Sequence, residues 1–307
     1  MRKSKTDRAL MKGAQEKVPS GESNGVCPYS YLYVYVLNGV LGASCESKCG
    51  ETFMGNWVED DTSFLFFSAP AENEIDAVLR GMNGLEVVET HVFPYETWQG
   101  GAVVPVRVDN FVMVPPWLDG GNDEEGIRIV IDPGVVFGNG LHPTTRDCLR
   151  ALASAANRCG LGRVVDLGTG TGVLAIAAAH LGAESALGID LNPLCVRTAE
   201  RNAKLNGLTH VRMAQGDMRE FALEPAELLV ANIPHAVIVD ILKKGFFPNK
   251  RRLILSGLMR SQALDVKSLL KEKGFALIRQ WDSEMTWFTL LVEKVQNASV
   301  SNHGISI

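Results

Sequence analysis

The sequence predicts an α/β fold with a doubly wound, mostly parallel sheet, preceded by a small N-terminal α+β domain. Two observations support this prediction. From residue 127 onward, apolar stretches of strand length alternate with stretches of helical periodicity, as in consecutive βα units. Before residue 96, several stretches rich in β-branched and aromatic residues surround one helical stretch, which is the pattern of a small α+β domain.

The composition of the 307 residues excludes several classes of protein. With 46% hydrophobic and 21% charged residues the chain can bury a large core, so wholesale disorder is excluded. No stretch reaches the roughly 18 consecutive apolar residues of a membrane helix, and the N-terminus lacks a signal-peptide core. A net charge of −5 does not indicate a nucleic-acid-binding surface. We therefore expect a cytoplasmic monomer that requires neither a membrane nor a nucleic acid as partner.

The cysteines do not predict a disulfide framework or a metal site. There are six of them, spread without a regular spacing, so reduced thiols are expected. Cys45 and Cys49 form a single C-x3-C pair, and only Cys27 is nearby in the sequence. This set lacks the fourth ligand of a structural zinc site, so no metal is predicted.

The first 126 residues contain a predicted tail, the small domain and a linker. Residues 1–26 are polar and show no apolar period, so a flexible tail is expected. Residues 27–95 form the small domain. Its strands are expected at 31–37, 53–58, 63–68 and 85–93, with a helix at 72–80 where apolar residues recur at helical spacing. Residues 96–126 contain paired prolines and an acidic, glycine-rich run, which is typical of a linker.

Residues 127–295 form the predicted doubly wound domain. Seven apolar stretches are expected as strands, at 163–167, 185–190, 210–214, 227–232, 252–256, 276–282 and 286–294. Helices are expected at 144–158, 173–181, 193–206, 236–244 and 262–273. Thr144 or Thr145 is expected to cap the first helix, and Gly182 and Gly274 follow the ends of two others. Residues 296–307 are expected to be a second flexible tail.

The turn that joins the first of these strands to a helix indicates a ligand site. Its residues are Gly168, Thr169, Gly170, Thr171 and Gly172. Glycines let the backbone turn tightly and approach a ligand, and the following helix offers free N–H groups. A dinucleotide fingerprint would have a third glycine where Val173 stands. The carboxylate of Asp166 would repel a pyrophosphate and suits a ligand that carries positive charge.

Two further carboxylates follow the next two strands. Asp190 ends its strand where an acidic residue accepts hydrogen bonds from ribose hydroxyls. Asp217, which precedes Met218, could accept from an adenine amino group. Taken singly, a glycine turn or a capping aspartate is common. All three motifs in this order and spacing instead predict a nucleoside pocket without a phosphate grip, as S-adenosylmethionine requires.

These motifs resemble those of class I methyltransferases, and two further segments narrow the resemblance. Residues 131–145, IDPGVVFGNGLHPTT, resemble the D-P-G-x-A-F-G-T-G-x-H-P-T-T signature of the PrmA family, the methyltransferases of large-subunit ribosomal protein eleven. Residues 230–233, VANI, resemble the V-A-N-I motif of that family. The similarity covers residues 95–294. The signature has Val136 where alanine is usual and Asn139 where threonine is usual, and the small domain resembles the family's substrate-recognition domain only weakly.

The resemblance implies a Rossmann-like class I methyltransferase fold, S-adenosylmethionine as cofactor, and a set of site residues. Phe137 and Gly138 would lie over the cofactor, and Thr144 or Thr145 would meet its carboxylate or only cap the helix. Asn232, followed by Ile233, would hold the acceptor amine in line for transfer. The expected cofactor-binding residues are Phe137, Gly138, Thr144, Thr145, Asp166, Gly168, Thr169, Gly170, Gly172, Asp190, Asp217, Met218 and Asn232.

The function that the resemblance implies is methyl transfer from S-adenosylmethionine to a lysine ε-amine or an N-terminal amine of a protein. Large-subunit ribosomal protein eleven is the first expected substrate. Three alternatives stay open. The chain could be a lysine methyltransferase of another protein, of the flavoprotein-subunit type, a small-molecule N-methyltransferase, or a cofactor-binding module without transfer activity. His235, close to Asn232, is a general-base candidate or else a surface histidine.

Overall fold

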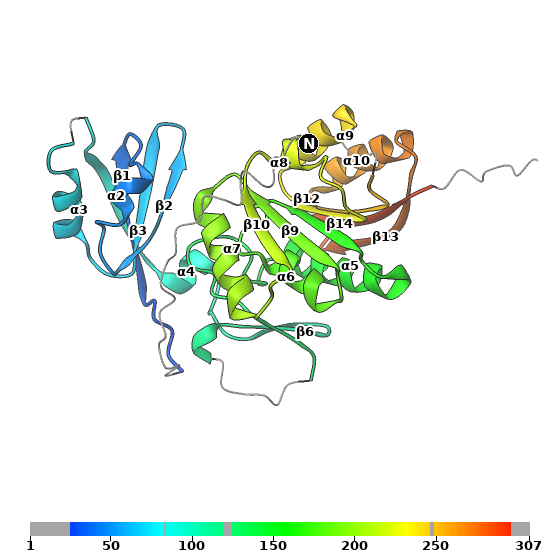
Figure 1. Cartoon of the computed structure of the whole chain (residues 1–307), viewed down its shortest axis with the longest axis horizontal. Helices are drawn as coiled ribbons and strands as arrows, with labels where there is room; N and C mark the ends of the chain where they lie inside the picture. Colours follow the sequence, from blue (N-terminus) through cyan, green and yellow to red (C-terminus); the bar gives the residue numbers. More distant parts are fainter. Residues whose placement is uncertain (1–24, 83, 119–124, 246–248, 296–307) are drawn as a thin grey trace, which may run out of the picture.

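The computed structural model describes residues 25–82, 84–118, 125–245 and 249–295, which form three sheets. The strand orders are β2-β3-β1-β4, β5-β6-β7 and β10-β9-β8-β11-β12-β14-β13. The first sheet stands apart at the N-terminal end of the molecule, and the other two lie together (Figure 1). The two predicted tails, 1–26 and 296–307, lie outside the described residues apart from positions 25 and 26.

The N-terminal sheet is antiparallel and has two unlike faces. Its strands are β1 (Tyr31–Asn38), β2 (Phe53–Glu59), β3 (Thr62–Phe67) and β4 (Val87–Pro94). Side chains alternate along a strand, so Tyr35 and Leu37 of β1 pack toward α3 (Glu72–Leu79), while Leu32 and Val34 face the large domain. The strands and the helix match their predicted segments. A short helix, α2 (Ala43–Glu46), lies in the segment 42–50, where no apolar period is present.

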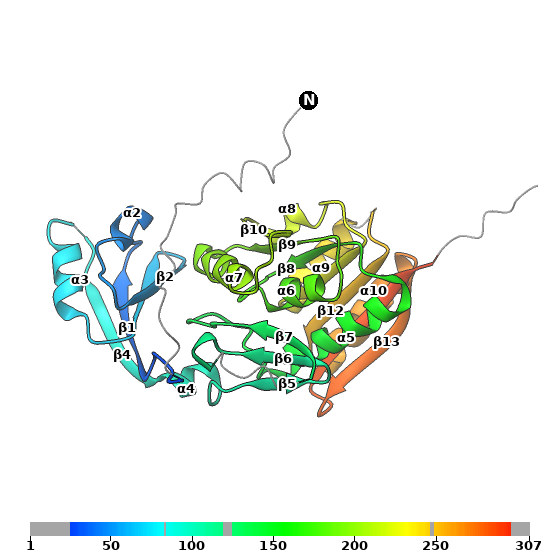
Figure 2. The ribbon, with the colours of Figure 1, turned by 60° about the horizontal axis from the view of Figure 1, so that its bottom comes forward.

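The predicted linker 96–126 contains regular structure. It includes most of α4 (Tyr95–Gln99), then β5 (Val106–Val108), β6 (Phe111–Val114) and the 3-10 turn η2 (Pro116–Leu118). β6 pairs in parallel with β7 (Ile127–Val130), and this small sheet lies against α5 and α6 (Figure 2). Strands of three or four residues are too short to show a period, which is why the sequence suggested a linker. The acidic positions 119–124 lie outside the described residues.

The large sheet has seven strands and is mostly parallel. Its strands are β8 (Arg163–Leu167), β9 (Ser185–Asp190), β10 (Val211–Gln215), β11 (Leu228–Asn232), β12 (Arg252–Leu258), β13 (Phe275–Ser283) and β14 (Trp287–Lys294). β8 to β12 run parallel, and β14 is inserted antiparallel between β12 and β13. The fold class predicted from the sequence is therefore confirmed, with all seven strands at their expected places.

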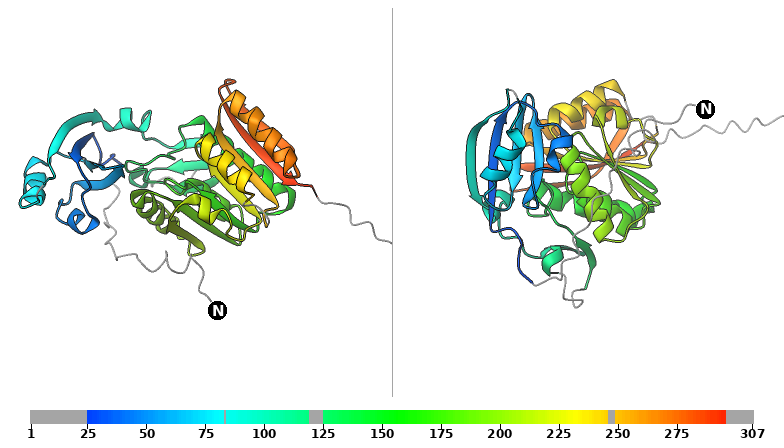
Figure 3. Two further views of the ribbon diagram at one scale, coloured as in Figure 1. Left: turned by 90° about the horizontal axis from the view of Figure 1, so that it is seen from above. Right: turned by 60° about the vertical axis from the view of Figure 1, so that its left-hand side comes forward.

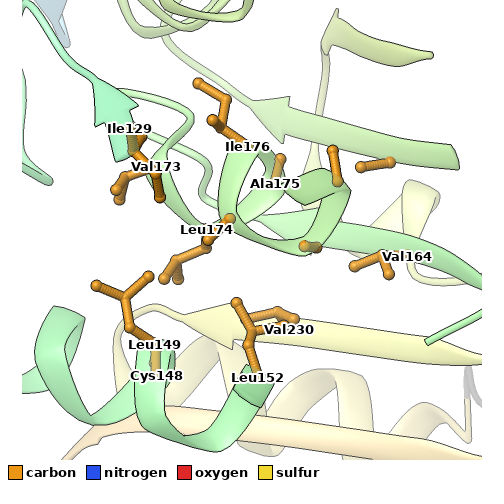
Figure 4. Close-up of a cluster of buried hydrophobic side chains, with 14 of the residues drawn as sticks. Ile129, Cys148, Leu149, Leu152, Val164, Val173, Leu174, Ala175, Ile176 and Val230 are labelled. Atoms are coloured by element: carbon orange, nitrogen blue, oxygen red, sulfur yellow. The ribbon is translucent and has the colours of Figure 1, made fainter. Parts of the chain in front are cut away.

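Helices cover both faces of this sheet. One face carries α5 (Pro143–Cys159), α6 (Val173–His180) and α7 (Pro193–Leu205). The other carries α8 (Met218–Phe221), α9 (His235–Lys244) and α10 (Arg260–Glu272), as Figure 3 shows for α9 and α10. Neighbouring residues of a strand point to opposite faces of the sheet. Val164 packs against the core beneath α5, α6 and α7, and Val165 packs against the core beneath α8, α9 and α10. In the first core, Leu149 of α5 lies beside Leu174 of α6 (Figure 4).

Two details differ from the expected elements. The N-cap of α5 is His142, whose Nδ1 accepts from the backbone N–H of Thr144, so neither Thr144 nor Thr145 is the cap. Pro143 occupies the first position of the helix, where its missing N–H costs nothing. α8 has only four residues and no detectable period, so the sequence did not predict it.

Among the described residues, no helix is long and apolar enough to span a membrane.

Candidate functional site

The candidate site lies at the carboxyl ends of β8, β9, β10 and β11. Because these strands are parallel, their carboxyl ends meet at one edge of the sheet, where open α/β sheets bind ligands. Gly168 and Thr169 both donate their backbone N–H to Ile189 O, at 2.8 and 2.9 Å, and Gly172 is the N-cap of α6. The sheet thus fixes the glycine turn, residues 168–172, in one conformation.

The glycine turn requires glycine for two reasons. Gly168, Gly170 and Gly172 all have positive φ, at 72°, 54° and 84°. A Cβ on Gly170 would lie 2.5 Å from the carbonyl oxygen of Phe137, and one on Gly168 would lie 2.5 Å from Cγ2 of Ile233. Ile233 and the turn are therefore in close contact, as expected for residues of one site.

The signature loop, residues 131–142, lies directly against the glycine turn. The backbone N–H of Thr171 donates to Phe137 O at 3.0 Å, and Thr171 Oγ1 donates to Gly138 O at 2.8 Å. The Phe137 side chain is 55% exposed, so its ring is free to cover a ligand. The signature loop and the glycine turn, whose residues are 34 and 33 positions apart at these two contacts, thus form one surface.

Asp166 is the most strongly perturbed acid of the site. Its side chain is buried, and burial raises the pKa of its carboxyl from 3.8 to about 7. Thr169 Oγ1 donates to Oδ2 at 2.6 Å, whereas Oδ1 has no partner among the described residues. A buried carboxylate oxygen without a donor fits a ligand that brings a positive charge or an N–H group.

Asp190 and Asp217 have different surroundings. The carboxylate of Asp190 accepts from the backbone N–H of Gly170 at 3.1 Å and of Asn192 at 3.0 Å, and burial raises its pKa. A carboxylate has about four acceptor positions, so ribose hydroxyls still find a place. Asp217 caps α8 and forms an ion pair with Arg219 at 3.3 Å. The structure therefore gives Asp217 the capping role that was the alternative interpretation, and its adenine contact stays a prediction.

Asn232 connects the end of β11 to α5. Its Nδ2 donates to Thr144 Oγ1 at 3.1 Å, and Thr144 Oγ1 lies 2.8 Å from Nδ1 of His142. Nδ1 of His142 also accepts the Thr144 N–H, so this nitrogen carries no proton, and burial lowers the pKa of His142. Thr144 therefore accepts from Asn232 and donates to His142. These hydrogen bonds occupy the Nδ2 end of the Asn232 amide. Its Oδ1 is therefore the atom that can accept a hydrogen bond from a ligand.

Other candidates are placed less closely. Thr145 is buried, and its Oγ1 has no partner among the described residues, which leaves it available to a polar group of a ligand. Met218 approaches the glycine turn, since its Cε would be 3.9 Å from a Cβ on Gly168. His235 pairs with Asp265 of α10 at 3.0 Å, which occupies the side chain that the sequence offered as a general base.

Several residues that shape the site gave no motif in the sequence. Asn202 of α7 is fully buried; its Oδ1 accepts from Asp132 N at 3.0 Å, and its Nδ2 donates to Thr171 O at 2.9 Å, so it joins the signature loop to the glycine turn. Gln99 and Tyr95 of α4 both donate to Gly134 O. A single asparagine on a helix has no pattern that would reveal this role.

A hollow lies against the signature loop. We call it the aromatic groove. It has a volume of about 710 Å³ and lies between the N-terminal sheet and the loop, with Trp57, Phe64, Phe66, Trp98 and Phe137 among its lining residues. His142 also lines it, so the groove and the Asn232 site share a wall.

The chain has close sequence relatives among known proteins. The ribosomal protein L11 methyltransferase of Geobacillus kaustophilus is 41% identical over 179 residues, which are 56% of this chain and 56% of that protein. The enzyme of the same name from Halalkalibacterium halodurans is 36% identical over 201 residues, 64% of either chain. The chain thus matches less than two thirds of the length of either relative.

A solved structure and a family model complete the comparison. The crystal structure of a ribosomal protein L11 methylase from Lactobacillus delbrueckii subsp. bulgaricus superposes with a TM-score of 0.56 at 28% identity, over 62% of this chain and all of that one. The model of the ribosomal protein L11 methyltransferase (PrmA) family matches residues 95–295, which include the glycine turn, the signature loop and Asn232. The chain therefore belongs to the ribosomal protein L11 methyltransferase (PrmA) family.

Proposed function

We propose that this protein is an S-adenosylmethionine-dependent methyltransferase that methylates a lysine ε-amine or the N-terminal amine of ribosomal protein L11. The observation that carries the proposal is the position of Asn232. It stands at the end of β11, is oriented by Thr144, and is followed by Ile233, which contacts the glycine turn. An acceptor group and a cofactor would therefore meet at one point. Family membership supports the named substrate.

The residues around the glycine turn fit the cofactor. Asp166 Oδ1 and Thr145 Oγ1 are buried polar atoms that a ligand can satisfy, and the absence of side chains at Gly168 and Gly170 lets the turn pack closely against Ile233 and Phe137. In the proposed complex Asp190 holds the ribose, Asp166 the charged methionine end, and Phe137 with Met218 covers the nucleoside. When bound, S-adenosylmethionine supplies a methyl group activated by its positive sulfonium.

The protein's own part in the reaction is to present a neutral amine. A lysine has an ordinary pKa of about 10.4, so roughly one in a few thousand is neutral at pH 7. Removing the ammonium from water lowers its pKa, because the charged form loses its hydration. Oδ1 of Asn232 accepts one amine N–H and thereby orients the nitrogen lone pair. Positioning of this kind accounts for much of the rate of such transfers.

We also propose that different parts of the chain have different functions. Residues 127–295 perform binding and transfer, and residues 27–95 recognise the substrate. Residues 96–126 connect the two and brace the signature loop through Gln99. Because ribosomal proteins are made in the cytoplasm, the reaction is proposed to occur there.

A transfer assay with radiolabelled S-adenosylmethionine tests the proposal. Purified ribosomal protein L11 is the substrate, and mass spectrometry locates the label. Label on a lysine or on the N-terminus supports the proposal, and Asn232→Ala is expected to reduce turnover while cofactor binding persists. Label on another protein in a cell lysate would replace the substrate. Cofactor binding without any transfer to protein would contradict the proposal and favour a small-molecule acceptor or a binding module.

A further inference from the structure

Four of the five aromatic rings that line the aromatic groove belong to residues with no assigned part in the proposed transfer. Trp57, Phe64 and Phe66 come from β2 and β3 of the N-terminal sheet, and Trp98 and Phe137 come from α4 and the signature loop. Phe66 is buried and packs at 58° against Trp98, with ring centroids 5.4 Å apart, whereas Trp98 and Phe137 are 40% and 55% exposed and offer ring surface to a ligand. Aromatic faces are electron-rich and attract cations.

The charges of the groove point to the same kind of ligand. Glu59 is the only carboxylate among the described residues that line it, and lysine and arginine are absent from this lining. The surrounding domain is acidic as well, since residues 27–95 contain ten aspartates and glutamates against two lysines and arginines. A field of this sign attracts positively charged segments of a partner.

The form of the cation follows from the hydrogen-bond partners that the groove offers. An ordinary lysine ammonium has three N–H donors that need acceptors once they leave water. Glu59 is exposed at the rim and serves at best one or two of them, and the side-chain oxygens of Gln99 and Asn139 in the lining already accept hydrogen bonds from the protein. A methylated ammonium has few or no N–H groups and is weakly hydrated, and aromatic surfaces with a nearby carboxylate recognise it well.

We propose that the aromatic groove binds the methylated lysine side chain of the protein substrate next to the transfer site. The groove shares His142 with the hydrogen-bonded chain that leads through Thr144 to Asn232, so a product side chain has only a short way to move. Holding the methylated group keeps the substrate bound between successive transfers. The identity of this occupant rests on the proposed function, whereas the affinity for methylated ammonium can be measured without it.

Binding of three blocked amino acids to the full chain tests the inference, in the absence of cofactor and protein substrate. They are Nα-acetyl-trimethyllysine methylamide, the corresponding unmethylated lysine, and the neutral isostere in which tert-butyl replaces trimethylammonium. We expect the trimethylated compound to bind at least about fivefold tighter than either of the others, as cation–π contacts imply. The Trp indole N–H resonances in an NMR titration report the binding.

Variants of neighbouring residues locate the site. Trp57→Leu and Glu59→Gln should each weaken binding of the trimethylated compound severalfold. The controls are Val58→Ala, next to Trp57 on the opposite face of β2 and 39% exposed, and Asp61→Asn in the adjacent turn; both should leave binding unchanged. Cofactor affinity should be unaltered in all four, because none contacts the glycine turn.

Each result decides the inference. Equal binding of the trimethylated compound and its neutral isostere would show a merely apolar hollow and overturn it, as would preference for unmethylated lysine or no saturable binding. Loss of binding in Val58→Ala as well would place the site elsewhere. Selective binding in a chain that transfers no methyl group to protein would leave this inference standing while refuting the proposed function.

Discussion

Asn232 and Thr144 are 88 positions apart in the sequence and are joined by a hydrogen bond of 3.1 Å from Nδ2 to Oγ1. Asn232 ends a strand of the sheet, and Thr144 lies in the first turn of α5. The bond fixes which end of the amide faces a ligand. It also ties the proposed acceptor site to the signature loop, because Thr144 Oγ1 contacts His142 at 2.8 Å.

Replacing Thr144 by valine is expected to lower turnover while cofactor affinity stays nearly constant. Valine keeps the shape of threonine but removes the hydroxyl, so the Asn232 amide loses the contact that orients it. Loss of one such hydrogen bond corresponds to about 1 kcal/mol, or roughly five- to tenfold in kcat. Thr144→Ser keeps the hydroxyl and should retain most of the activity. Equal losses in both variants would contradict an orienting role for the hydroxyl.

Asp166 should make the stability of the protein depend on pH. Its pKa is about 7 in the folded protein and near 3.8 when unfolded, so between these values the native state holds a proton that the unfolded state has lost. The contribution of this group to the unfolding free energy is thus full below pH 4 and is lost as the pH rises to 7. Urea unfolding from pH 5 to 8 should show a steeper decline for the parent protein than for Asp166→Asn. Parallel curves would be inconsistent with the raised pKa.

Asp190 and Asp217 are expected to differ in their effect on cofactor binding. Asp190→Ala removes a half-buried carboxylate next to Gly170, and loss of a charge-assisted hydrogen bond amounts to about 1.5–3 kcal/mol, or roughly ten- to hundredfold in Kd. Asp217→Ala should have a smaller effect, because that carboxylate already pairs with Arg219. Isothermal titration with S-adenosylmethionine measures both. An equal or larger loss in Asp217→Ala would reverse the assignment.

Gly170 is expected to tolerate no side chain. Both Gly170 and Gly182 have positive φ, but a Cβ on Gly182 meets nothing within 4 Å, whereas one on Gly170 lies 2.5 Å from Phe137 O. Gly182→Ala should therefore cost only the backbone strain of about 1–2 kcal/mol. Gly170→Ala should lose clearly more unfolding free energy and also cofactor affinity, because the signature loop must move. Similar unfolding curves for the two variants would argue against this close contact.

The strand–helix pattern of the large domain could be predicted because it depends on local regularities. Strands such as 163–167 are apolar runs, and helices such as 193–206 begin at proline and carry an apolar face. The same local patterns did not predict β5 and β6 in residues 96–126. These short strands are stabilised by pairing within the sheet that β7 completes and by packing against α5 and α6, and they carry no local period of their own.

The sequence by itself determined the class of fold, the family resemblance and the residues proposed to bind the cofactor, because a glycine turn and a carboxylate at a strand end are written in consecutive residues. Only the tertiary structure decided which atoms meet: that Asn232 faces Thr144, that Asn202 joins two loops, and that Asp217 caps α8. The aromatic groove belongs to this second group as well, since its rings come from two separate parts of the chain. The physical reason is that side-chain contacts depend on distances across the fold, which no local pattern of residues records.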